Sequence, residues 1–284
     1  MWGKILFLLL LLSPYHVFAE DPFTNISTFE MGEKLTFDID VLFLDRVAVG
    51  SAEIELVDKD EKVFKATVEA KIARFFIQRK NVYESLMKYE PSEKKFKPIS
   101  FTESKFKKNR SYMKRTFYDK SKSVLAEERW RDGEFESRKE KSLEISEFNE
   151  DIITAFYNLR IQAYGTVQDG KNFVVKSMHR EGKFYFTINI LKGKDKEKIA
   201  SKAIKYDYNG KFYTEILTPK EVFDAQGGRL FVSFDEYLVP NFVLVKKVIG
   251  LGTIRGRLVN VESNLQDIHS QPKESIISKN PGNE

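Results

Sequence analysis

The sequence contains no cysteine among its 284 residues. This absence excludes disulfide bonds, cysteine-ligated zinc or iron–sulfur centres, a catalytic thiol and attachment of a lipid through cysteine. Histidine is also scarce, with three residues in the whole chain. The chemistry that remains open therefore rests on carboxylates, on a few histidines and on non-covalent ligands.

Long apolar runs are missing as well, apart from one at the N-terminus. Lys4 precedes an apolar stretch over residues 5–12, and Val17-Phe18-Ala19 comes before the first acidic residues. This pattern is typical of a secretory signal peptide that is cleaved after Ala19. An uncleaved membrane anchor, the alternative, needs about 20 apolar residues, and this run ends before Pro14. We therefore expect a periplasmic protein with no transmembrane segment after cleavage.

The charge balance is only mildly basic, with 47 Lys and Arg against 42 Asp and Glu. An exported protein rarely meets nucleic acid, so we expect no nucleic-acid partner. The positive excess is compatible with simple solubility, and where it indicates a partner it indicates anionic lipid or acidic glycan. At 42% hydrophobic residues, the chain has enough apolar side chains to form a folded core.

A period of two residues dominates the mature chain. Leu35, Phe37 and Ile39 alternate with polar residues, and Phe184, Phe186 and Ile188 repeat the pattern far downstream. Such alternation predicts β-strands with one face exposed to water, and the short polar turns between them predict antiparallel pairing. Strands are predicted at 34–41, 52–56, 64–72, 81–89, 99–106, 111–118, 123–130, 184–190, 204–208, 211–217, 230–234, 242–249 and 253–261.

One segment near the middle follows a helical period instead. Ile152, Phe156, Leu159 and Ala163 recur at spacings of three and four, with Asn149 as the expected N-cap. The fold class is therefore mainly β, either a large curled antiparallel sheet or an open barrel or sandwich of short strands, with one central amphipathic helix near 150–164 covering the sheet. We expect a signal peptide (1–19), a polar lead-in (20–30), a single β domain (31–263) and a flexible polar tail (264–284).

Several segments together resemble a family of exported bacterial proteins known as the domain of unknown function 3108 family. The matching segments are Gly32 to Ile39 followed by Val49-Gly50-Ser51-Ala52, then Tyr83-Glu84-Ser85, then the helix from Asp151 to Arg160, and finally Gly227 to Asp235 with Pro240. The family has a tryptophan where Phe231 to Phe234 stand in this chain. The resemblance implies an exported, mainly antiparallel β protein, and it implies no catalytic or binding residues.

Signatures of catalysis are absent from the sequence. His179 and His269 have no partner at a metal-ligand spacing, and no nucleophile elbow surrounds a serine. Glu33, Glu84 and Asp235 lie in the family-like segments, and we expect Glu33 and Asp235 to bond turn backbones. Gly227-Gly228 precedes a strand rather than a helix, so it predicts a turn or bulge and no phosphate loop. We expect no enzyme activity, no cofactor and no metal.

The most distinctive charge feature is a predicted hairpin that turns near Lys108-Asn109. Its two arms interleave basic and aromatic residues, so a cationic ribbon could bind anionic lipid or glycan. The alternative is an edge hairpin whose lysines only protect it from aggregation. The candidate binding residues are Lys105, Lys107, Lys108, Arg110, Tyr112, Lys114 and Arg115.

The leading functional hypothesis is a non-catalytic binding or carrier protein for an amphiphilic or anionic component of the cell envelope. It follows from the 24 phenylalanines and 12 tyrosines, which could line an apolar cavity in a curled sheet. One alternative is an envelope structural or assembly factor that acts through a protein partner. A second is a carboxylate-based hydrolase, which requires two acids facing one cleft, at least one of them with a raised pKa.

Overall fold

The computed structural model describes residues 26–41, 44–74, 77–119, 122, 124–142, 149–177, 185–205, 209–218, 229–248 and 252–263. The expected signal peptide at 1–19 and the expected tail at 264–284 lie outside these residues, as do His179, His269 and Gly227-Gly228.

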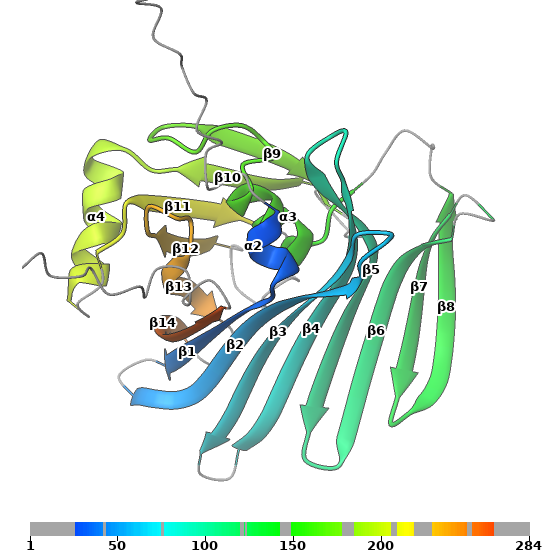
Figure 1. The fold of residues 1–284 in the computed structure, drawn as a ribbon. Coiled ribbons are helices and arrows are strands. Elements are labelled where there is room, and N and C mark those ends of the chain that lie inside the picture. Colours follow the sequence, from blue (N-terminus) through cyan, green and yellow to red (C-terminus); the bar gives the residue numbers. More distant parts are fainter. Residues whose placement is uncertain are drawn as a thin grey trace, which may run out of the picture.

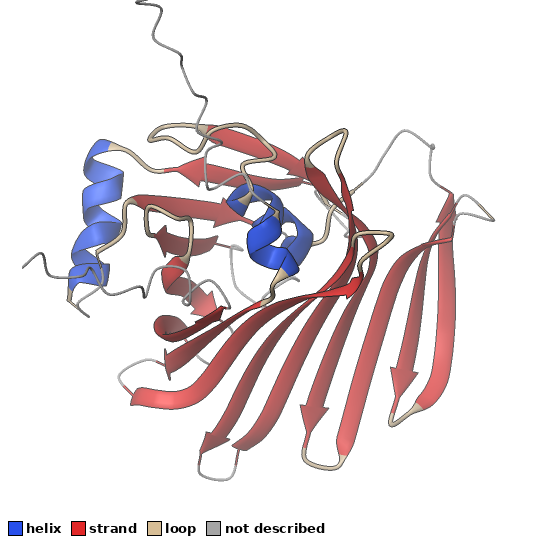
Figure 2. Ribbon diagram, viewed as in Figure 1, coloured by secondary structure: helices blue, strands red, loops and turns tan. Residues whose placement is uncertain are grey.

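The chain is mainly β, as the alternating pattern predicts, and the helices are few (Figure 2). The strands are β1 (Glu33–Val41), β2 (Leu44–Asp58), β3 (Val63–Arg74), β4 (Ile77–Glu90), β5 (Lys95–Lys107), β6 (Arg110–Asp119), β7 (Val124–Arg131), β8 (Glu134–Ser142), β9 (Asn172–Lys176), β10 (Tyr185–Ile190), β11 (Phe212–Leu217), β12 (Arg229–Phe234), β13 (Pro240–Val248) and β14 (Gly252–Ser263). The helices are α2 (Ser27–Glu30), α3 (Ile152–Arg160) and α4 (Gly193–Ile204).

All fourteen strands belong to one antiparallel sheet in the order β8-β7-β6-β5-β4-β3-β2-β1-β14-β13-β12-β11-β10-β9. The sheet is not closed, because β8 and β9 form its two edges. The chain runs outward from β1 to β8, passes through α3 to the opposite edge, and returns strand by strand until β14 pairs with β1 (Figure 1). This is the curled, open antiparallel sheet among the predicted alternatives.

Helix α3 lies on the concave side of the sheet and is packed from two directions. Ala155 and Leu159 belong to a buried cluster with side chains of β9–β12, whereas Ile153 and Tyr157 belong to a second buried cluster with side chains of β2–β5. The central amphipathic helix is thus confirmed as the element that fills the curl. Its N-cap is Asp151 and not the predicted Asn149, because the Asp151 side chain accepts hydrogen bonds from the backbone of Ile153 and Thr154.

The end of the expected lead-in is ordered against this core. α2 is a single turn, and its Phe29 is 4% exposed. The Phe29 ring packs edge-on against Tyr157 of α3, with ring centroids 5.3 Å apart. Burial of a phenylalanine side chain stabilises a fold by about 2 kcal/mol, so the segment just before β1 contributes to the core.

Helix α4 was not predicted, and it covers the convex face of β11–β13. It buries only Ile199 and Ala203, against Phe231 and neighbouring side chains. Two apolar positions are too few to mark a helical stripe in the sequence. The strand predicted at 204–208 is wrong at Ile204, which ends α4, and residues 206–208 lie outside the described part of the chain.

Candidate functional site

The predicted cationic hairpin is confirmed as β5 and β6, joined by a turn at Lys108-Asn109. Lys107 lies directly opposite Arg110, Lys105 opposite Tyr112, and Lys108 in the turn has a positive φ of 52°. Residues directly opposite each other on antiparallel strands project from the same face of the sheet. The register therefore decides which side chains of the ribbon act together.

Five of the seven predicted residues share the concave face of the sheet. Phe101 of β5 is buried in the cluster that packs on α3, so the face of β5 that carries Phe101 is the concave one. Glu103, Lys105 and Lys107 follow Phe101 on that face by alternation. Their partners in β6 extend the set, so that the concave side carries Lys105, Lys107, Arg110, Tyr112 and Lys114.

The remaining two predicted residues lie elsewhere. Arg115 is opposite Thr102 and Glu128 on the convex face, and its guanidinium lies 5.2 Å from the centroid of the Phe117 ring. Lys108 is in the turn. The separation of Arg115 from Lys114 follows from the alternation of the predicted strand at 111–118, because neighbouring residues of a strand project to opposite faces.

Two basic residues of β7 that are not among the predicted binding residues also lie on the concave face. Arg129 lies opposite Lys114, and Arg131 lies opposite Tyr112. Arg129 lies in the predicted strand at 123–130 and Arg131 directly follows it, so their alternation is the signal that could have identified them once the order of strands is known. We call Lys105, Lys107, Arg110, Tyr112, Lys114, Arg129 and Arg131 the cationic patch.

Acidic side chains accompany this patch: Arg129 pairs with Glu127 at 2.7 Å, Arg131 pairs with Glu136 at 3.0 Å, and Glu103 lies at its centre. The Glu103 carboxylate oxygens lie 2.9 Å from Lys105 Nζ and 3.1 Å from Lys114 Nζ, and the residue is 8% exposed. Burial acts to raise the pKa of Glu103, but the two ammonium groups outweigh burial and leave the pKa below its usual value. Glu103 is therefore ionised at neutral pH and offsets part of the positive charge of the patch.

The same concave face turns apolar toward the middle of the sheet. One row of directly opposite residues, read outward from β1 to β6, is Phe37, Gly50, Ala70, Asn81, Lys105 and Tyr112. The next row is Leu35, Ala52, Val68, Tyr83, Glu103 and Lys114. We call Phe37, Ala52, Val68 and Ala70, all half-buried, the apolar strip. Along the first row, the cationic patch begins two strands after the apolar strip. Along the second row, Tyr83 and Glu103 intervene and the patch begins at Lys114, three strands after Val68.

The aromatic residues expected to line a cavity are mostly used for packing. Phe64, Phe96, Phe186 and Phe234 are fully buried around α3, so the space between the helix and the sheet is filled. A shallow depression does lie on the convex face, lined by Lys80, Val82, Glu84, Ser104 and Phe106. The apolar cavity expected from the aromatic content is therefore replaced by a packed core around α3 in the described part of the chain.

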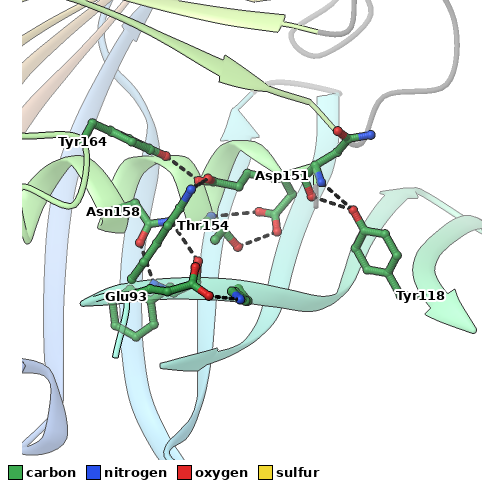
Figure 3. A network of polar contacts seen from close by, with 11 residues as sticks. Glu93, Tyr118, Asp151, Thr154, Asn158 and Tyr164 are labelled. Carbon is green, nitrogen blue, oxygen red and sulfur yellow. Dashed lines mark hydrogen bonds and ion pairs between the residues drawn. The ribbon is translucent and has the colours of Figure 1, made fainter. Parts of the chain in front are cut away.

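Buried acids gather at the start of α3, where the hydrolase alternative would place its chemistry (Figure 3). The Asp151 carboxylate accepts hydrogen bonds from the hydroxyls of Ser85 (2.8 Å) and Thr154 (2.7 Å). It also accepts from the backbone N–H groups of Ile153 and Thr154, both at 2.9 Å. Burial raises the pKa of Asp151, and these hydrogen bonds act against that rise. All of these contacts attach the helix to itself and to β4.

Glu150, next in the chain, is similarly enclosed. Lys95 Nζ lies 2.6 Å from one carboxylate oxygen, and the other accepts hydrogen bonds from the Asn158 amide at 2.8 Å and from the Tyr164 hydroxyl. Burial, with the Glu150 charge beside it, raises the pKa of Tyr164. Both acids therefore serve as structural partners within the described residues, and this arrangement gives no support to a carboxylate hydrolase.

The acids singled out in the sequence also have structural partners. Asp235 accepts hydrogen bonds from the backbone N–H groups of Tyr237 (2.9 Å) and Val239 (2.8 Å), which confirms the predicted turn contact. Glu33 does not bond a turn, contrary to prediction, and instead forms a buried ion pair with Arg160.

Among the residues that the structure describes, no three acidic or histidine side chains are grouped to hold a metal ion. Nor is any helix in that part of the chain long and apolar enough to span a membrane.

Comparisons with known proteins add no assignment. No model of a known protein family matches the chain, and no curated protein or solved structure is significantly similar to it.

Proposed function

We propose that this protein is an exported, non-catalytic carrier that binds an anionic amphiphile on the concave face of its open sheet. The observation that carries the proposal is the continuity of the apolar strip with the cationic patch along the rows from Phe37 to Tyr112 and from Leu35 to Lys114. An acyl chain would lie on the strip, and a phosphate or carboxylate headgroup would meet the lysines.

The apolar strip and the cationic patch contribute comparable free energies of binding. Burying an acyl chain stabilises a complex by about 0.8 kcal/mol per methylene, and a basic residue near an anionic headgroup contributes about 1 kcal/mol. A chain of moderate length and a few lysines together therefore reach micromolar affinity. Neither the acyl chain alone nor the headgroup alone reaches micromolar affinity on this partly exposed surface.

Two features of the sequence support an envelope location for this activity. The N-terminal pattern predicts export, and the resemblance to the domain of unknown function 3108 family implies the same. We propose on this basis that the ligand is a component of the bacterial cell envelope and that the protein acts in the periplasm. Native mass spectrometry of the protein purified from its own envelope would identify a lipid or glycan that is carried with it.

The first test uses the probe dodecyl phosphate below its critical micelle concentration. Lys107→Gln combined with Arg110→Gln removes two concave charges and leaves both partners of Glu103 in place. We expect this variant to bind dodecyl phosphate about thirtyfold more weakly, because two headgroup contacts of about 1 kcal/mol each are lost. Isothermal titration calorimetry measures the change.

The matched control is Lys34→Gln combined with Lys71→Gln, which removes two charges from the convex face. It should leave the affinity for dodecyl phosphate unchanged. Dodecyl maltoside and inorganic phosphate, which keep only the chain or only the charge, should bind more weakly than dodecyl phosphate. Equal losses in both double variants, or equal affinities for all three probes, would show that the concave face is not the site.

A second test uses a substitution that should strengthen the binding of dodecyl phosphate. Glu103→Gln keeps the shape of the side chain and removes the negative charge between Lys105 and Lys114. We expect about fivefold tighter binding of dodecyl phosphate, because one unit of charge near the headgroup corresponds to about 1 kcal/mol. Unchanged or weaker binding by a variant that remains folded in circular dichroism would contradict the proposed headgroup position.

A protein partner is a second candidate function, favoured by the edge strand β9. Val174 of β9 is 68% exposed, and Tyr185 of the neighbouring β10 is 49% exposed. Exposed edge strands with apolar side chains can pair with another chain. If the protein purified from its envelope carries no lipid or glycan and crosslinks through β9, an assembly factor is the better description.

A further inference from the structure

A second group of basic side chains lies on the opposite face of the sheet from the cationic patch. Lys194, Lys198 and Lys202 follow one another at intervals of one helical turn along α4. Ile199 and Ala203 of α4 are buried against β11–β13, so this lysine row runs along the flank of the helix where it meets the sheet. In Figure 1, α4 lies at the end of the molecule away from β5–β8.

Lys246 of β13 meets this row from the sheet side. Its ammonium group lies 4.6 Å from the centroid of the Phe231 ring, so the side chain is held flat over the convex face beneath α4. Burial lowers the pKa of Lys246, and repulsion by Lys202 and Lys198 lowers it further. Phe231 belongs to the same buried cluster as Ile199 and Ala203 of α4, so Lys246 lies beside the flank of the helix that carries Lys198 and Lys202.

The acidic group that acts on Lys246 in the other direction is Glu215, and its effect is the smallest. Glu215 also faces Arg229, at 3.5 Å, and the Asn189 amide, at 3.5 Å. Among the residues that the structure describes, no ion pair joins Lys198, Lys202 or Lys246 to a carboxylate. Converging positive charges of this kind, from a helix and a strand, match the arrangement that recognises a tetrahedral anion.

We propose that Lys198, Lys202 and Lys246 form a binding site for a phosphate group, either free or as the headgroup of an anionic lipid. An anion placed between the three ammonium groups replaces their mutual repulsion with charge-assisted hydrogen bonds. The Phe231 ring holds Lys246 in position for this contact. The site is separate from the concave face, so it does not depend on the amphiphile-carrier proposal.

The test follows the Lys246 side-chain signals of the ¹³C-lysine-labelled mature protein by NMR, identified by their loss in Lys246→Gln. Inorganic phosphate is added at constant ionic strength, with chloride as the replaced ion. We expect phosphate to raise the pKa of Lys246, because the bound anion stabilises the charged form. Lys202→Gln should weaken phosphate binding about tenfold, the change expected for loss of one charge-assisted hydrogen bond.

Lys196→Gln is the matched control, because Lys196 belongs to the same helix but pairs with Asp169 at 2.7 Å on the other flank. It should bind phosphate as the unaltered protein does. A second arm replaces phosphate with phosphatidylglycerol vesicles, and vesicle binding that Lys202→Gln weakens and Lys196→Gln does not would assign the phosphate group to a lipid. Absence of binding in both arms, or equal loss in Lys196→Gln and Lys202→Gln, would overturn the proposal.

Discussion

Replacing Arg160 with methionine is expected to lower the free energy of unfolding by about 3–5 kcal/mol. Arg160 at the end of α3 donates to both carboxylate oxygens of Glu33 in β1, with one N–O distance of 2.8 Å, and both side chains are at most 4% exposed. The Arg160→Met variant leaves the Glu33 carboxylate buried without its cation. The guanidinium also lies 5.0 Å from the Phe29 ring centroid, so the contact of α2 with the core weakens too.

The control is the double variant Arg160→Met with Glu33→Leu. Replacing a complete buried ion pair by apolar side chains of similar volume is often neutral, because the cost of removing two charges from water disappears with the charges. We therefore expect the double variant to recover most of the stability lost in Arg160→Met. Urea unfolding followed by tryptophan fluorescence measures both. A double variant less stable than Arg160→Met would show that the pair itself, and not the unpaired charge, dominates.

Asp151→Ala is expected to lower the free energy of unfolding by about 3 kcal/mol. The substitution removes the N-cap of α3 and leaves the hydroxyls of Ser85 and Thr154 and two backbone N–H groups without their buried acceptor. Because α3 lies between the two main apolar clusters, loosening its first turn affects both halves of the sheet. Thermal unfolding followed by circular dichroism measures the loss.

Asp151→Asn distinguishes the hydrogen bonds from the charge. The asparagine oxygen can accept from both backbone N–H groups, and its amide can donate to the two hydroxyls, so we expect most of the stability to remain.

Since burial raises the pKa of Asp151 in the folded protein, the folded state binds a proton more tightly than the unfolded state. Stability from this residue is therefore full below the usual aspartate pKa and is lost as pH rises through the raised value. Asp151→Asn should abolish that component, and a pH profile identical to that of the unaltered protein would contradict the assignment.

The fold class could be predicted from local patterns because strand alternation reports burial directly. Phe186, Ile188 and Ile190 alternate with polar residues in the sequence, and all three are buried in β10. Prediction was weaker where a strand carries small side chains. β2 extends from Leu44 through Gly50 to Asp58, well beyond the predicted 52–56, because alanine and glycine do not mark an apolar face in the sequence although they lie on the concave one.

Only part of the candidate site could be predicted from the sequence. The sequence identifies Lys105, Lys107 and the β-turn between the two arms, because these depend on neighbours in the chain. It does not identify Glu103 as the acid between two lysines, nor Arg129 as a neighbour of Lys114, because these relations depend on the pairing of separate strands.

By itself, the sequence determined an antiparallel β protein with a central helix and a cationic hairpin, since short-range periodicity and turn residues specify each of these features. Only the tertiary structure decided that the sheet stays open between β8 and β9, that β1 pairs with β14, and that Arg160 meets Glu33 across 127 positions of the chain. It also brought the apolar strip and the cationic patch onto one concave face. The physical reason is that the register between strands and the curl around α3 are set by packing of distant side chains, whereas periodicity reports only which residues are buried.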